Sequence, residues 1–376
     1  MNLFVLSQLQ PKQNHVGWAV NHTLEDVIRS TCGVTFLYPS ENNEIALFNQ
    51  LKLTCSGEDA INRFRHRLFK SWYNLEKLPT LGKGPNILLV VGLNIEFLLS
   101  MHALGPLLKQ FDLRLGYLLD GIHPDDIDRT VLPYLDHLFV ISAEIAEETQ
   151  SRLGLSSSFL PLATNTIHST LNLHRYPRWI DIISYGRGNK EFHKFLQGHF
   201  NSSNDDRVYH HSTFAEPYLY DRAEHIALMT KLLDRSKISV CFEASSVERF
   251  RGYSPILYRW FEAWAAGCTV IGRKPFGQGV AELMDWENSA IDIPENPADW
   301  ALFIEALLAD NDTLQENAQR NYQECLLRHD WRYRLRDMFN QVGLPLPDSL
   351  TSQIADLQEK ARDARISAMI PLPSLS

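Results

Sequence analysis

The chain has few cysteines, and their spacing does not gather them into a cluster. Five cysteines are scattered over 376 residues, and no two of them form a C-x-x-C pair. An odd and dispersed set argues against a disulfide framework and against a zinc cluster. A reducing compartment is therefore expected, and with it a cytoplasmic location.

An excess of basic residues is also missing. The sequence has 36 Lys and Arg against 45 Asp and Glu, which gives a formal net charge of −9. Proteins dedicated to nucleic acids normally carry a basic surface, so no nucleic-acid partner is expected. A local basic site for a small anion is still compatible with this balance.

Long apolar runs are scarce. Residues 87–107 approach the length of a membrane span, but this stretch contains Asn94, Glu96 and His102. Because a charge within a bilayer is costly, we interpret it as a buried strand followed by a helix. The N-terminus has no basic leader and is interpreted as a strand rather than a signal peptide. An Arg- and aromatic-rich stretch at 64–73 would suit a membrane contact, but an ordinary amphipathic helix explains it equally well, so no membrane contact is predicted.

What the sequence does show is a regular alternation of strand and helix patterns. In the first half, strands are predicted at 2–6, 34–38, 87–92, 113–119 and 138–141, and helices at 24–31, 58–73, 96–108 and 143–153. In the second half, strands are predicted at 180–185, 208–211, 238–242, 269–272 and 290–293, and helices at 190–196, 224–233, 257–266, 298–308, 312–327 and 331–339. Such alternation indicates parallel sheets covered by helices on both faces.

The alternation restarts after residue 165, which predicts two α/β domains. We expect two Rossmann-like, doubly wound domains, 1–165 and 166–343, that face a central cleft, with ligands at the carboxyl ends of the strands. A Pro-rich break then opens a tail at 344–376, with a helical pattern over 351–369. This tail could pack back across the cleft or mediate assembly, or it could be a solvated terminal helix.

The most informative segment is 253–272, which predicts a loop, a helix, a glycine-ended turn and a buried strand. Glu262 is a carboxylate on an otherwise aromatic and small-residue helix, and a buried carboxylate requires partners. It could accept hydrogen bonds from two sugar hydroxyls. The alternative is an exposed Glu, or one that is paired with Arg259.

The residues Phe261-Glu262-Ala263, Ala265-Ala266-Gly267 and Val270-Ile271 resemble the C-terminal domain of group 1 (family 4-like) glycosyltransferases, in the style of the spore-maturation CgeB-type branch. The resemblance extends in pattern over most of 110–340. It implies the glycosyltransferase B fold, with a nucleotide-sugar donor on the C-terminal domain and an acceptor on the N-terminal one. It also implies that Glu262 binds the donor ribose and that transfer is retaining and metal-independent, with no cofactor.

The family pattern places another Glu at the position of Ser254. Ser254 could still bond a phosphate or a sugar hydroxyl, and the neighbouring Tyr253 could add a contact. The departure also supports an alternative in which the chain is a non-catalytic protein that binds a nucleotide sugar or a partner. A sugar epimerase on the same architecture is a third alternative.

Phosphate contacts are predicted after the first strand of the second domain. There Arg187 and Lys190 match in placement the basic residues that many such transferases use on the donor diphosphate. The alternative is a strand-to-helix turn with solvated charges. By the same resemblance, Gly17 lies in a loop that approaches the donor.

Acceptor chemistry is predicted after the strand at 113–119. Asp120 and His123 follow that strand, and either could orient or deprotonate an acceptor hydroxyl. The D-x-D pattern at Asp126 and Asp128 is interpreted as a helix start rather than a metal site. The sequence does not identify the acceptor, which could be a carbohydrate, a lipid or a small molecule.

Overall fold

The computed structural model describes residues 1–9, 16–41, 72–169, 171, 177–186, 188–200, 206–211 and 221–369. By its internal contacts the chain divides into two compact units, one of 1–13 with 32–160 and the other of 14–31 with 161–376. The sequence predicts a domain boundary after residue 165. The two units instead divide after Leu160, and residues 14–31 belong to the second unit. Within the described ranges, no helix combines the length and the apolar character needed to cross a membrane.

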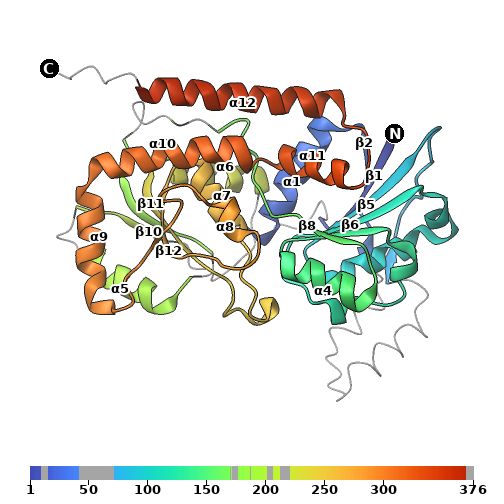
Figure 1. Ribbon diagram of the computed structural model, residues 1–376, viewed down its shortest axis with the longest axis horizontal. Coiled ribbons are helices and arrows are strands. Elements are labelled where there is room, and N and C mark those ends of the chain that lie inside the picture. Colours follow the sequence, from blue (N-terminus) through green and yellow to red (C-terminus); the bar gives the residue numbers. More distant parts are fainter. Residues whose placement is uncertain are drawn as a thin grey trace, which may run out of the picture. The chain divides into compact units, whose positions relative to one another are not determined.

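The first unit contains a six-stranded, fully parallel sheet with strand order β2-β1-β5-β6-β7-β8 (Figure 1). Its strands are β1 (Asn2–Ser7), β2 (Val34–Leu37), β5 (Asn86–Gly92), β6 (Leu113–Leu118), β7 (His137–Val140) and β8 (Ser157–Phe159), beside a small antiparallel pair of β3 (Ser40–Glu41) and β4 (Tyr73–Asn74). Its helical segments are η2 (Ile95–Gln110), η3 (Pro124–Asp126), η4 (Leu132–Tyr134) and α4 (Ala143–Leu153).

Two helices that the sequence predicts for this unit, at 96–108 and 58–73, are not seen as α-helices among the described residues. The helix expected at 96–108 is instead the 3-10 segment η2, which is interrupted at Gly105, whose φ is 54°, and at Pro106, which has no N–H to donate. The helix expected at 58–73 lies almost entirely outside the described residues. The other strands and α4 form where the alternation predicted them, and residues 87–92 are the fully buried strand β5.

The second unit contains a five-stranded parallel sheet with strand order β10-β9-β11-β12-β13. Its strands are β9 (Ile180–Ser184), β10 (Tyr209–His211), β11 (Ser236–Phe242), β12 (Thr269–Arg273) and β13 (Ile291–Asp292). Its helices are η1 (Val16–Trp18), α1 (Ala19–Thr31), α5 (Lys190–Phe200), α6 (Arg222–Asp234), η5 (Glu248–Phe250), α7 (Tyr258–Ala265), α8 (Val280–Leu283), η6 (Pro297–Asp299), α9 (Trp300–Ala309), α10 (Asn311–Arg328), α11 (Trp331–Gln341) and α12 (Asp348–Met369).

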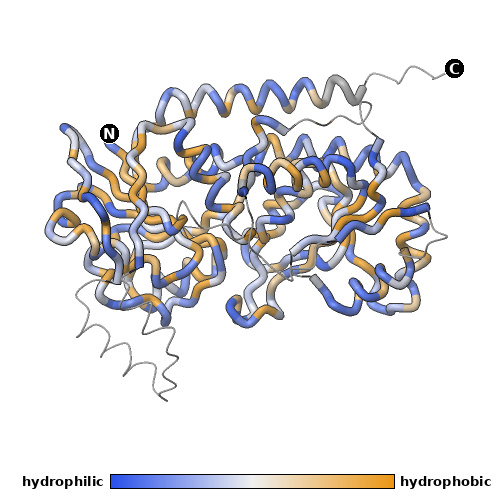
Figure 2. Tube along the Cα trace, turned by 180° about the vertical axis from the view of Figure 1, so that it is seen from behind, coloured by the Kyte–Doolittle hydropathy of each residue, from blue (hydrophilic) through white to orange (hydrophobic). Residues whose placement is uncertain are grey.

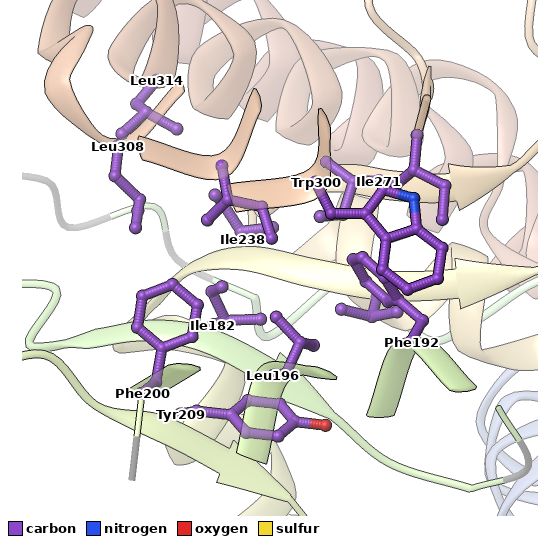
Figure 3. Close-up of a cluster of buried hydrophobic side chains, with 13 residues drawn as sticks. Ile182, Phe192, Leu196, Phe200, Tyr209, Ile238, Ile271, Trp300, Leu308 and Leu314 are labelled. Atoms are coloured by element: carbon purple, nitrogen blue, oxygen red, sulfur yellow. The ribbon is translucent and has the colours of Figure 1, made fainter. Parts of the chain in front are cut away.

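Alternate residues of the central strand β11 face opposite sides of this sheet. Ile238 and Val240 join a buried cluster with side chains from α5 and α9, whereas Cys241 lies on the side of α7. Figure 3 shows the cluster, in which the Trp300 indole meets the Phe192 ring edge-on with 5.0 Å between centroids. Hydrophobic residues concentrate along the strands (Figure 2). Both faces of the sheet are therefore covered, as predicted.

Helix α1 is joined to the second unit by specific hydrogen bonds. The Thr23 hydroxyl lies 3.0 Å from the Tyr258 hydroxyl and accepts a 3.0 Å hydrogen bond from the Trp331 indole. At the other end of α1, the Ser349 hydroxyl donates to the carbonyl of Thr31. These bonds explain why a helix from the N-terminal part of the sequence belongs to the second unit.

The C-terminal tail forms the long helix α12, which packs against α1, α10 and α11. Its buried face consists of Leu350, Ile354, Leu357 and Ala361, which recur at helical spacing. The Lys360 ammonium also donates to the carbonyl of Ile167 at 2.7 Å. The tail is thus an integral part of the second unit, with one buried face and one solvated face.

Gly272 provides a test of the β11–β12 contact. Its φ is 147°, and a Cβ at this position would overlap the carbonyl oxygen of Cys241. We expect Gly272→Ala to lower the free energy of unfolding by about 1–3 kcal/mol, since it adds both backbone strain and a steric overlap. Gly198→Ala is the control, because no atom lies within 4 Å of a Cβ there, and Ala should stabilise α5 by about 1 kcal/mol. Urea unfolding measures both, and wild-type stability for Gly272→Ala would contradict the expectation.

Candidate functional site

The strand order of the second sheet determines where a site should lie. In an open parallel sheet, ligands bind beyond the carboxyl ends of the strands at the point where the strand order reverses. Here that point lies between β9 and β11, because chain order runs from β9 outward to β10 and then back to β11. The residues that follow these strands are Tyr185 and Gly186 after β9, and Glu243 after β11.

Glu262 lies on α7 in contact with this edge. The Tyr185 hydroxyl donates to its Oε2 at 3.3 Å and lies 3.2 Å from the Arg259 carbonyl oxygen. Burial raises the pKa of the Glu262 carboxyl to about 7, while the Tyr185 hydrogen bond and the Arg259 charge act in the opposite direction. The residue nevertheless keeps a partly exposed surface. The structure therefore shows a constrained, partnered carboxylate at the strand-order reversal.

Arg259 packs over the loop that follows β9. Its Nη1 donates to the Tyr185 carbonyl at 3.4 Å. Gly186 has a φ of 71°, and a Cβ there would lie 3.4 Å from the guanidinium carbon of Arg259. A guanidinium beside a glycine places a positive charge close to the backbone of this loop. The sequence pattern indicates Arg259 as a possible partner of Glu262, but it does not predict that Arg259 lies over the loop after β9.

The raised pKa of Glu262 predicts a pH-dependent stability. Because the native chain holds this proton at pH values where the unfolded chain has lost it, the free energy of unfolding falls as the pH rises toward 7. Gln cannot titrate, so we expect Glu262→Gln to unfold at a higher temperature than wild type at pH 8, with a smaller difference at pH 5. Thermal unfolding at both pH values measures this.

The control for that comparison is Glu248→Gln, which removes an exposed carboxylate. It should leave the pH dependence of the unfolding temperature as in wild type. If Glu262→Gln shows the same behaviour as this control, the Glu262 carboxyl does not titrate in the range that its surroundings predict.

Glu243 is a second carboxylate at this edge, and it is held in place by two serines. Its Oε2 accepts from the Ser245 N–H at 2.5 Å and from the Ser254 hydroxyl at 3.0 Å, and its Oε1 accepts from the Ser245 hydroxyl at 2.9 Å. Ser254 itself is buried, whereas Glu243 is partly exposed. The sequence pattern directed attention to Ser254 and missed Glu243.

Lys190 and Tyr253 are two further predicted donor residues that the structure describes. Lys190 is exposed and begins α5, where the Asn189 side chain accepts from the N–H groups of Glu191 and Phe192. Arg187 lies outside the described residues. Tyr253 follows η5, with its N–H donating to the Phe250 carbonyl at 2.9 Å. Their roles stay predictions.

Gly17 lies in η1, immediately before α1, and is exposed. It belongs to the same compact unit as Glu262. Thr23 of α1 lies against Tyr258, the first residue of α7, so the N-terminal half of α1 is close to the start of the helix that carries Glu262. A donor contact by Gly17 stays a prediction that this arrangement supports.

The predicted acceptor residues lie in the first unit, in the loop after β6. The Asp120 side chain accepts from the Gly121 N–H at 2.8 Å. His123 Nδ1 accepts from the Asp125 N–H at 3.3 Å, and its Nε2 lies 3.8 Å from a Glu148 carboxylate oxygen. His123 therefore lies beside a carboxylate of α4. Catalysis by either residue stays a prediction.

The D-x-D pattern is part of local structure. Asp126 ends η3, and the Asp128 carboxylate accepts from both the N–H and the hydroxyl of Thr130, at 2.8 and 2.7 Å. Asp128 thus stabilises the turn that leads into η4.

Comparisons with known proteins agree with this geometry. Residues 196–340, which include Glu243, Ser254 and Glu262, match a family described as "Glycosyl transferase-like". No curated protein matches the chain. Among solved structures, the chain is similar to Anabaena HepE in complex with UDP-glucose, at 10% identity and a TM-score of 0.51, covering 91% of this chain and 99% of that one.

Two further solved structures also cover about nine tenths of this chain, with slightly lower TM-scores than HepE. The N-terminal domain of Candida albicans trehalose-6-phosphate phosphatase has 10% identity and a TM-score of 0.49, with 91% of this chain and 96% of that one covered. S. aureus TarM has 8% identity and a TM-score of 0.49, with 90% and 98% covered. The family match supports the predicted group 1 resemblance over 196–340, the similarity to HepE shows the glycosyltransferase B fold, and the CgeB-type branch stays a prediction.

Proposed function

We propose that this chain, whose residues 196–340 match the glycosyl transferase-like family, transfers a sugar from a nucleotide-diphosphate sugar to an acceptor hydroxyl. The observation that supports this most strongly is the position of Glu262. A partnered carboxylate with a raised pKa lies at the strand-order reversal of the second sheet, within the matched segment. Such a carboxylate can accept hydrogen bonds from two vicinal hydroxyls of a ribose.

The diphosphate leaving group would be stabilised by cations on the same edge. Negative charge accumulates on the diphosphate as the bond to the sugar breaks, and fixed positive groups lower the barrier. Lys190 at the start of α5 and Arg259 beside Gly186 are the described candidates, and Arg187 is the third. Because these residues can neutralise the charge, we propose metal-independent transfer without a cofactor. Retention of configuration follows from the family resemblance.

The acceptor would bind the first domain near Asp120 and His123. Either residue could orient the acceptor hydroxyl or remove its proton. The acceptor could be a carbohydrate, a lipid or a small molecule. The proposed division of function follows the predicted domains, with the acceptor on 1–165 and the donor on 166–343, while the tail at 344–376 packs on the second unit through α12. A cytoplasmic location is also part of this proposal.

A non-catalytic protein that binds a nucleotide sugar is the second candidate, supported by Ser254 where the family has Glu. One experiment separates the two. UDP, GDP and their glucose and mannose conjugates are titrated by calorimetry, and release of free nucleotide diphosphate is then followed with an acceptor panel. UDP-glucose is the first choice because it is bound in HepE. Binding with turnover supports the transferase, and binding without turnover supports a non-catalytic protein that binds a nucleotide sugar. Binding of none of these nucleotides contradicts the donor site and leaves a non-catalytic protein that binds a partner.

A further inference from the structure

We propose that Glu243 recognises the sugar of the donor, and that Ser254 acts as a positioning residue for it. This inference rests on the proposed function, because it assigns a role within the same donor site. It also gives a physical reason for Ser254 at a position where the family has a carboxylate: the carboxylate comes from the end of a neighbouring strand.

The position of Glu243 suits this role. It follows β11 directly, so its backbone is fixed by the sheet, and its N–H donates to the Arg273 carbonyl at the end of β12. Two residues earlier, Cys241 is close enough to Arg259 and Glu262 for their charges to affect its pKa. Glu243 and Glu262 are therefore two carboxylates at the same end of the sheet, on different elements.

The orientation of the Glu243 carboxylate is also constrained. The bonds from Ser245 and Ser254 occupy both acceptor positions of Oε2 and one of Oε1. A carboxylate has about four such positions, so one on Oε1 is left over among the described contacts. With the side chain partly exposed, that position can accept a hydroxyl. The buried Ser254 hydroxyl already donates its hydrogen to Glu243, so this hydrogen is not available for a bond to a ligand.

A purely structural role would have a different signature. Glu243 could simply tie the strand end to the loop that ends at Ser254, where Arg251 has a φ of 48°. Gln can maintain that tie, because its amide oxygen can accept from the Ser245 N–H and the Ser254 hydroxyl while its NH2 group donates to the Ser245 hydroxyl oxygen. Sugar recognition, in contrast, affects ligands with a sugar and leaves the nucleoside diphosphate unaffected. Comparing the two ligands on one variant therefore separates the two roles.

The test uses the full-length chain and calorimetric titration with UDP and UDP-glucose, or with the corresponding GDP pair if wild type prefers it. We expect Glu243→Gln to weaken UDP-glucose binding about tenfold, as for loss of a hydrogen bond to a charged group, and to leave UDP binding within about twofold. Ser254→Ala should show the same selectivity with a smaller loss. Glu248→Gln, an exposed carboxylate of the same loop, should change neither.

Equal losses for UDP and UDP-glucose in Glu243→Gln would overturn the inference and assign Glu243 to the loop structure. No loss for either ligand would overturn it as well. Thermal unfolding of each variant identifies a loss caused by misfolding, and Ser254→Ala, which keeps the carboxylate, then gives an independent reading of the same selectivity. Failure of the proposed function is distinct: wild type itself would then bind none of the nucleotides.

Discussion

Replacing Asp330 by Ala should lower the free energy of unfolding by about 3–5 kcal/mol, the usual consequence of leaving a buried charge without its partner. Asp330 and Arg332 are almost completely buried, with side-chain exposures of 0% and 2%. Arg332 Nη1 donates to Asp330 Oδ1 at 2.8 Å. In the variant, the partners left to the Arg332 guanidinium among the described residues would be the neutral side chains of Gln353 and Asn165.

The same carboxylate also fixes the segment that enters the second unit. Its Oδ2 accepts from the N–H and the hydroxyl of Thr166 at 2.7 and 2.8 Å. Thr164 is paired with the backbone on either side of Asp330, through bonds of 3.0 Å to His329 and Trp331. Loss of Asp330 would therefore leave a buried N–H unsatisfied as well as a buried cation.

Urea unfolding measures this effect, and the chain offers a matched control. Asp285 pairs with Arg328 at the surface, with side-chain exposures of 60% and 33%. Asp285→Ala should cost far less than Asp330→Ala, because solvent screens the pair. Asp330→Asn should fall between the two, since it keeps an acceptor but removes the charge. Similar losses for Asp330→Ala and Asp285→Ala would contradict the buried network as described.

The second large effect concerns ligand binding. Glu262→Ala should weaken binding of the preferred nucleotide diphosphate at least about tenfold, because a hydrogen bond to a charged group contributes about 1.5–3 kcal/mol. The loss should be of similar size for the nucleotide diphosphate and for the nucleotide sugar, because both contain the ribose. This pattern differs from the one expected for Glu243, which affects only the nucleotide sugar.

Tyr185→Phe provides the graded control for Glu262. It removes the 3.3 Å hydrogen bond to the Glu262 carboxylate but keeps the ring and the charge. Its loss of affinity should be smaller than that of Glu262→Ala. Calorimetric titration at pH 8, where Glu262 is mostly ionised, measures both variants. Wild-type affinity in Glu262→Ala would show that the ribose does not bind at this carboxylate.

Those parts of the fold that depend on local signals could be predicted from the sequence. Helix α4 runs over Ala143–Leu153 as expected, with Ser142 as its N-cap and Gly154 at a φ of 66° as its C-cap. The parallel strands could also be located, since buried strands appear as short apolar runs between turns. Glu262 could be singled out because it is a carboxylate on an apolar helix within a recognisable motif.

What the sequence could not show depends on contacts between distant residues. The assignment of α1 to the second unit depends on Thr23 meeting Tyr258, 235 residues away. The orientation of Glu243 depends on Ser254, which reaches it across a loop. The position of Arg259 over Gly186 likewise requires α7 to pack beside the loop after β9. Periodicity and spacing in the sequence do not indicate contacts between such distant residues. The sequence therefore provides no reason to single out Glu243.

The proposed function requires that a nucleotide sugar bind at the carboxyl edge of the second sheet with its ribose on Glu262. The decisive experiment is a crystal structure of the chain with saturating UDP. We expect the ribose hydroxyls within about 2.7–3.2 Å of the Glu262 carboxylate oxygens and the diphosphate beside Arg259 and Lys190. A UDP molecule bound elsewhere, or a chain that crystallises without bound nucleotide at saturation, would contradict it.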